Sequence, residues 1–60
     1  MIVKLKGKDG RLDVTEKDVK AVTVSNGTIH IDYKKPYKWG IVSGVGYYTD
    51  EYDLVSVSNK

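Results

Sequence analysis

The feature that most constrains this chain is an Asn-Gly pair, Asn26-Gly27, set between two runs of alternating apolar and polar residues. Asn and Gly tolerate the positive backbone φ angles of a two-residue turn, so this dipeptide is the strongest short-range hairpin signal. With the pair as the turn, apolar residues face apolar ones and polar residues face polar ones. The facing pairs are Ser25 with Thr28, Val24 with Ile29, Thr23 with His30 and Val22 with Ile31. The sequence therefore predicts the register of this hairpin as well as its existence.

A second hairpin is predicted at the N-terminus, where Val3 and Leu5 alternate with lysines before a glycine-bounded turn at residues 7–10. A tip at Lys8-Asp9 pairs apolar residues across the two strands and sets charged residues together on the outer face. The pairs expected are Leu5 with Leu12, Val3 with Val14 and Lys4 with Asp13.

Between the hairpins, Thr15 is expected to cap a single helical turn that ends near Asp18. A helix continuing through Val22 is rejected, because residues 19–24 are rich in β-branched side chains and lead directly into the Asn-Gly turn.

The C-terminal half predicts two further strands. Pro36 lacks a backbone donor and is expected to end the strand before it. The next strand alternates apolar residues with glycines, which permit coiling, a bulge or the close approach of another backbone. Its apolar members are Trp39, Ile41, Val45 and Tyr47, and its glycines are Gly40, Gly44 and Gly46. A turn over residues 50–53 then leads to a last strand, residues 54–58, with Val55 and Val57 facing in.

These elements predict one all-β domain, residues 1–60, with five strands and no substantial helix. Two hairpins, a glycine-coiled fourth strand and a short fifth fit a small SH3-like or OB-like barrel. A half-open antiparallel sheet that dimerises to hide its edges fits equally, so monomer and homodimer both stay open.

Residues 2–33 resemble, in layout, the small DNA-binding chromatin proteins of thermophilic archaea. The shared features are a lysine-rich first hairpin, an Asp-Val-Thr crossover and a second hairpin ending in tyrosine. The resemblance implies an SH3-like barrel whose second hairpin presents an outward DNA platform with apolar wedges. Here that face carries Thr23, Ser25, Thr28 and His30, none of which is a wedge. The likeness is therefore one of architecture.

Composition narrows the function. The chain has no cysteine, one histidine and a net charge of +2, which excludes thiol chemistry and an overwhelmingly basic nucleic-acid coat. His30 is expected to be a solvated strand residue, and residues 50–53 a solvated acidic turn without calcium-loop spacing. The sequence thus predicts a protein that is not an enzyme and holds no cofactor or metal. Without a signal peptide or apolar span, the expected location is the cytoplasm.

All six aromatic residues are tyrosine or tryptophan, which are enriched at protein interfaces. Tyr33, Trp39 and Tyr47 are expected in the core. The remaining aromatic candidates lie in two loops of opposite charge. The predicted protein-binding set is acidic and tyrosine-rich: Tyr37, Tyr48, Asp50, Glu51, Tyr52 and Asp53. The alternative, nucleic-acid-binding set is basic and aromatic: Lys34, Lys35, Tyr37, Lys38 and Trp39.

The first functional hypothesis is a noncatalytic protein-binding module that acts stoichiometrically on another protein, as a regulator or inhibitor. A phage-encoded inhibitor of a bacterial enzyme or defence system is one concrete version. The alternative is nucleic-acid binding through residues 33–39, helped by Lys4, Lys6 and Lys8. A structural subunit that pairs its strand edges with copies of itself is the third, and a small-ligand pocket at the barrel mouth stays open.

Overall fold

The computed structural model describes residues 1–37 and 42–59 of the chain. This part is all-β and contains six strands rather than the five expected. The reason is that the two hairpins alone account for four strands, so the glycine-rich strand is the fifth and the last strand the sixth. The strands are β1 (Ile2–Gly7), β2 (Val14–Glu16), β3 (Val19–Ser25), β4 (Thr28–Tyr37), β5 (Val42–Tyr48) and β6 (Tyr52–Ser58).

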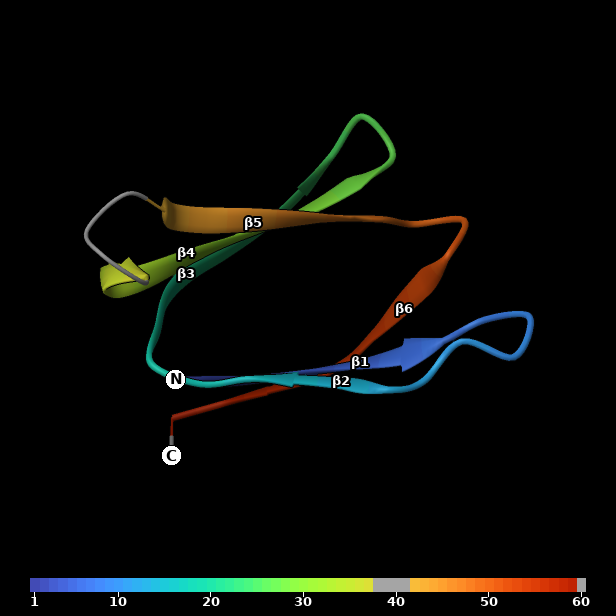
Figure 1. Ribbon diagram of the computed structural model, residues 1–60, viewed down its shortest axis with the longest axis horizontal. Helices are drawn as coiled ribbons and strands as arrows, with labels where there is room; N and C mark the ends of the chain where they lie inside the picture. The colour runs from blue at the N-terminus through green and yellow to red at the C-terminus, as the bar shows by residue number, and fades with distance from the viewer. Residues whose placement is uncertain (38–41, 60) are drawn as a thin grey trace.

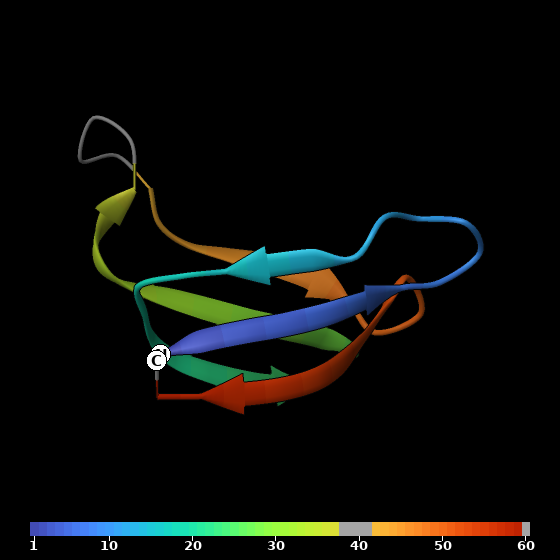
Figure 2. The same cartoon turned by 90° about the horizontal axis from the view of Figure 1, so that it is seen from below.

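The strands form two antiparallel sheets of three strands each, which lie as two layers in Figure 1. The first sheet has the order β2-β1-β6, and the second has the order β3-β4-β5. In Figure 2, seen from below, the first sheet lies in front of the second, with β6 at its free edge. The arrangement is not a closed barrel, because no ladder joins the outer strands of the two sheets all the way round.

The hairpin formed by β3 and β4 confirms the predicted register at all four pairs, from Val22 opposite Ile31 to Ser25 opposite Thr28. Its turn residues have positive φ, 50° at Asn26 and 72° at Gly27. Both central residues of a type I′ turn take such angles, and this turn follows the right-handed twist of the strands.

The hairpin formed by β1 and β2 exists, but its predicted register is wrong by two residues. Leu5 faces Val14 instead of Leu12, and Lys4 faces Thr15 instead of Asp13. The loop is longer than a two-residue tip because Asp13 leaves the ladder and accepts a hydrogen bond from the Gly7 amide at 3.0 Å. Leu12 is consequently 86% exposed.

The helical turn predicted after Thr15 is absent, because Thr15 lies within β2 and faces Lys4. The chain instead passes from the first sheet to the second at Lys17-Asp18, where Asp18 has a φ of 57°. Two hydrogen bonds anchor this joint. The Val19 amide donates to the Met1 carbonyl at 3.0 Å, and the Met1 amino group donates to the Val19 carbonyl at 2.8 Å.

Strand β4 does not end at Pro36, as predicted, but runs on to Tyr37, which faces Val42. The missing proline donor is accommodated because the register between β4 and β5 shifts between Asp32 and Tyr37. Proline is tolerated at such ladder irregularities.

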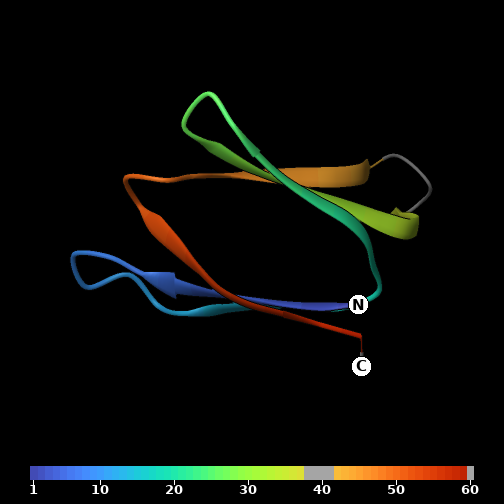
Figure 3. The same ribbon diagram turned by 180° about the vertical axis from the view of Figure 1, so that it is seen from behind.

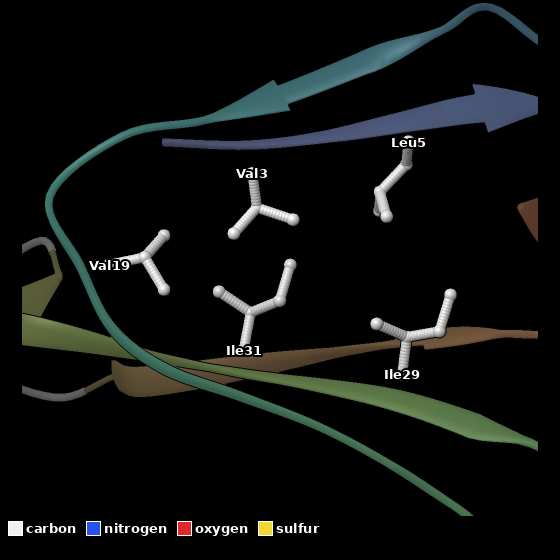
Figure 4. Close-up of a cluster of buried hydrophobic side chains, with 5 residues drawn as sticks. All are labelled: Val3, Leu5, Val19, Ile29 and Ile31. Carbon is white, nitrogen blue, oxygen red and sulfur yellow. The ribbon is translucent and has the colours of Figure 1, made fainter. Parts of the chain in front are cut away.

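Five side chains form the buried core, and Figure 4 shows them filling the space between the layers. They come from both sheets: Val3, Leu5, Val19, Ile29 and Ile31.

The inward direction predicted for the last strand is confirmed for Val57 and wrong for Val55. Val55 is the extra residue of a bulge against β1 and is 61% exposed. Val57 lies opposite Val3, on the inner face, but remains 45% exposed because β6 is the outer strand of its sheet.

The first and last strands are neighbours, with Ile2 opposite Ser58. The two ends of the chain therefore lie together, as the view from behind in Figure 3 shows.

Candidate recognition surfaces

One side of the sandwich is closed by a carboxylate held between two tyrosines. Glu16 lies opposite Val3 and so faces inward from β2. The Tyr33 hydroxyl donates to its Oε1 at 2.8 Å, and the Tyr47 hydroxyl donates to its Oε2. Burial of the phenol, followed by its bond to the Glu16 carboxylate, raises the pKa of Tyr47 well above its ordinary value. This Glu16 cluster links the first sheet to the second.

The tyrosines expected in the core lie there, since Tyr33 and Tyr47 are half-buried and pack against the buried cluster. Tyr52 packs there as well, although the sequence placed it with the surface candidates. Its ring meets that of Tyr47 edge to face, with centroids 5.1 Å apart. Trp39 lies outside the described residues.

The acidic turn is engaged within the chain. Glu51 Oε2 lies 3.3 Å from Arg11 Nη2, and Asp53 Oδ1 lies 3.3 Å from Lys8 Nζ. Lys8 also donates from Nζ to the Thr49 carbonyl at 2.8 Å and from its amide to the Glu51 carbonyl at 2.9 Å. Two of the three predicted acidic contacts therefore have partners on the loop between β1 and β2, a pairing that linear sequence does not reveal.

Tyr48 differs from Tyr33, Tyr47 and Tyr52 because it is 61% exposed. It lies opposite Thr28, whose other neighbour is Ser25, so it belongs to the outer face of the second sheet. Beside it, Gly46 faces His30 and presents no side chain. We call this the Tyr48 surface, made up of Ser25, Thr28, His30, Gly46 and Tyr48. Asp50 follows it as an exposed residue.

Gly44, farther along the same strand, is required by its neighbours. A Cβ there would lie 2.8 Å from the Ile31 carbonyl oxygen and 2.9 Å from Asp32 Oδ1. The prediction that these glycines allow the close approach of another backbone is confirmed at Gly44. Gly40 lies outside the described residues.

Only part of the basic segment, residues 33–39, lies within the described residues. Lys34 is exposed. The pKa of the Met1 amino group is lowered mainly by desolvation and then by the positive charge of Lys34. Lys35 and Tyr37 belong to the end of β4. Lys38 and Trp39 lie outside the described residues, so the nucleic-acid set remains a prediction.

The first sheet carries a groove on its outer face that sequence reasoning did not find. It is open, has a volume of about 340 Å³, and is lined by Lys4, Lys6, Asp13, Thr15 and Val55 among others. The lysine alternation in β1 places both amines on this face, but the bulge that brings Val55 there leaves no signal in the sequence.

Candidate chemistry is sparse in the described part of the chain. His30 is exposed, as predicted, and no three His, Asp or Glu side chains of residues 1–37 and 42–59 converge as a metal site would require. No helix within these ranges has the length and apolar character to cross a membrane.

Comparison of the sequence with protein-family models and curated proteins, and of the structure with solved structures, finds no match.

Proposed function

We propose that this chain is a noncatalytic protein-binding module that acts stoichiometrically, as a regulator or inhibitor, through the Tyr48 surface. The observation that carries the proposal is the exposure of Tyr48, at 61%, while Tyr33, Tyr47 and Tyr52 pack against the core. A tyrosine provides a large rigid contact area and one polar group, and truncating such a residue at the centre of an interface costs about 2 kcal/mol or more.

The proposed surface is narrower than the one expected from the sequence. Glu51 and Asp53 already pair with Arg11 and Lys8, so a partner would have to compete for them. Asp50 remains an exposed carboxylate close to Tyr48 in the chain. A partner suited to this surface presents an apolar pocket for the Tyr48 ring with a Lys or Arg beside it.

We also infer an SH3-like relation between the two sheets, which is the finer form of the all-β assignment. Support comes from the joint at Lys17-Asp18, where two residues separate β2 from β3 and the chain changes sheets. The paired hydrogen bonds between Met1 and Val19 keep this joint beside β1, as in a half-open barrel whose strands turn a corner between sheets.

The test is an affinity capture from host lysate with wild-type protein, Tyr48→Ala and Tyr48→Phe, each with and without nuclease and at two salt concentrations. We expect one defined protein to be retained by wild type and Tyr48→Phe, after nuclease and at higher salt, and released by Tyr48→Ala. Thr15→Ala, an exposed change on the outer face of the other sheet, is the control and should retain it.

Equal retention by Tyr48→Ala would contradict the assignment of the surface. Nucleic acid bound at low salt and lost at higher salt would instead favour the basic segment, because phosphate contacts weaken steeply with salt.

A further inference from the structure

The outer edge of β6 is apolar for an exposed strand. Leu54, Val55 and Val57 are 38%, 61% and 45% exposed. No residue from Leu54 through Ser58 is charged. Free strand edges are usually protected by lysine, proline or inward-pointing charges, which block pairing with another chain. Over these five consecutive residues β6 has none of them, and its bulge at Val55 is the one feature there that protects an edge.

The other edge strands in the described part of the chain are β2, β3 and β5. β5 carries no charged residue either, but it contains two glycines and exposes one large apolar side chain, Tyr48. β2 has three residues, lies between Asp13 and Lys17, and is covered on its inner side by the Glu16 cluster. β3 carries Lys20 and exposes one large apolar side chain, Val24. Half of the exposed large apolar residues in the structure therefore belong to β6.

We propose that β6 pairs with β6 of a second copy of this chain, antiparallel and across a two-fold axis. The two first sheets then join into one continuous six-stranded sheet. Such an interface is self-complementary, because each contact between two residues occurs twice, once on each side of the axis. This proposal does not depend on the Tyr48 surface, which lies on the other sheet.

The bulge within β6 supplies a register, because it puts Leu54 and Val57 on the same face. Leu54 faces Leu5 and Val57 faces Val3, so both lie on the inner face. With the axis between Val55 and Ser56, Leu54 of one copy meets Val57 of the other. The same axis sets Val55 against Ser56 and Asp53 against Ser58, and these residues share the outer face. The bulge occurs in both copies at the axis, so the residue counts match.

The accessible surface of the chain is larger than a compact monomer of this mass should have, which agrees with an edge that a second copy covers. The chain exposes 4496 Å², whereas a compact monomer of 6.7 kDa is expected to expose about 3,900 Å². The excess of about 600 Å² is of the order that one partner buries in a standard interface, about 800 Å². A second copy on β6 would reduce this excess.

The first test is the molecular mass by sedimentation equilibrium over a range of concentrations. We expect wild type to reach the mass of two chains, and Val57→Lys to stay at one chain with an unchanged β-sheet circular dichroism spectrum. Ser43→Lys puts the same charge on exposed β5 and should behave as wild type. A wild type that stays at one chain throughout, or a folded Val57→Lys that still dimerises, would overturn the proposal.

A cross-linking test holds even where the lysine variant fails to fold. The chain has no cysteine, so single variants report without background. In the proposed register Leu54→Cys meets Val57→Cys only when the two variants are mixed. We expect a disulfide dimer that forms faster in the mixture than in either variant alone. Equal rates in all three samples would refute the register.

Discussion

Glu16 joins the two sheets through side-chain hydrogen bonds. Each of its carboxylate oxygens accepts a hydrogen bond from a tyrosine of the second sheet. A half-buried hydroxyl that loses its acceptor bears the cost of its own desolvation, about 1 to 3 kcal/mol. Two tyrosine hydroxyls donate to this single side chain.

Glu16→Ala should therefore lower the free energy of unfolding by about 2 to 3 kcal/mol, measured by urea denaturation. The matched control is Glu51→Ala, which removes a carboxylate paired with Arg11 on the surface. Exposed ion pairs contribute about 1 kcal/mol or less, so the control should be nearly neutral. Equal losses in the two variants would mean that the tyrosine contacts contribute nothing beyond a surface pair.

The raised pKa of Tyr47 predicts how stability depends on pH. Burial and the Glu16 carboxylate favour the neutral phenol of Tyr47 in the folded state. In the unfolded chain the same phenol ionises near pH 10.0. The stabilisation is thus complete below this pH and is lost as the pH rises above it, because the unfolded state releases its proton first.

We expect the free energy of unfolding to fall as the pH rises above about 10 in wild type, with a shallower fall in Tyr47→Phe. Tyr48→Phe removes an exposed hydroxyl and should leave the wild-type slope unchanged. Only the difference in slope between the proteins is informative. Parallel curves for wild type and Tyr47→Phe would contradict the assigned role of burial.

At the scale of the elements, the two hairpins show what a sequence pattern can predict. The β3–β4 register follows from the turn dipeptide and from apolar pairing, both of which are local and agree with each other. The β1–β2 register depends on the Asp13 carboxylate binding the Gly7 amide, and on loop contacts to Glu51. Such side-chain and long-range bonds outweigh a plausible apolar pairing and leave no periodic trace in the sequence.

The glycines of β5 allow a test with a built-in control. A Cβ at Gly44 would lie 2.8 Å from a backbone oxygen of β4, whereas one at Gly46 would meet only the Thr28 methyl group at 3.2 Å. Gly44→Ala should cost about 1 to 3 kcal/mol by overpacking against a backbone that cannot turn away. Gly46→Ala should be near neutral, since the reduced freedom of the unfolded chain offsets a mild contact.

The measurement is the urea midpoint of each variant at constant slope. A Gly46→Ala variant as destabilised as Gly44→Ala would indicate that glycine is needed along β5 for its backbone conformation rather than for the approach of β4.

At the scale of the whole molecule, the all-β class was predictable because every strand carries its own alternation or turn signal. The division into two sheets was not. The division depends on Lys17-Asp18, where the chain passes between the layers instead of forming the predicted helical turn. It also depends on which tyrosines donate to Glu16. The candidate site changed for the same reason, since loop residues Lys8 and Arg11 engage two of its three acidic residues.

The pairing of β1 with β6 sets an order of events during synthesis. Strands β3, β4 and β5 follow one another and can pair as soon as they leave the ribosome, because closing short loops costs little entropy. β1 has only β2 beside it until Tyr52–Ser58 has been made. Strand β1 is made before β2 to β6 and is thus among the last of them to be completed. Until then the edge that β6 later covers is open to chaperones, proteases or a neighbouring nascent chain.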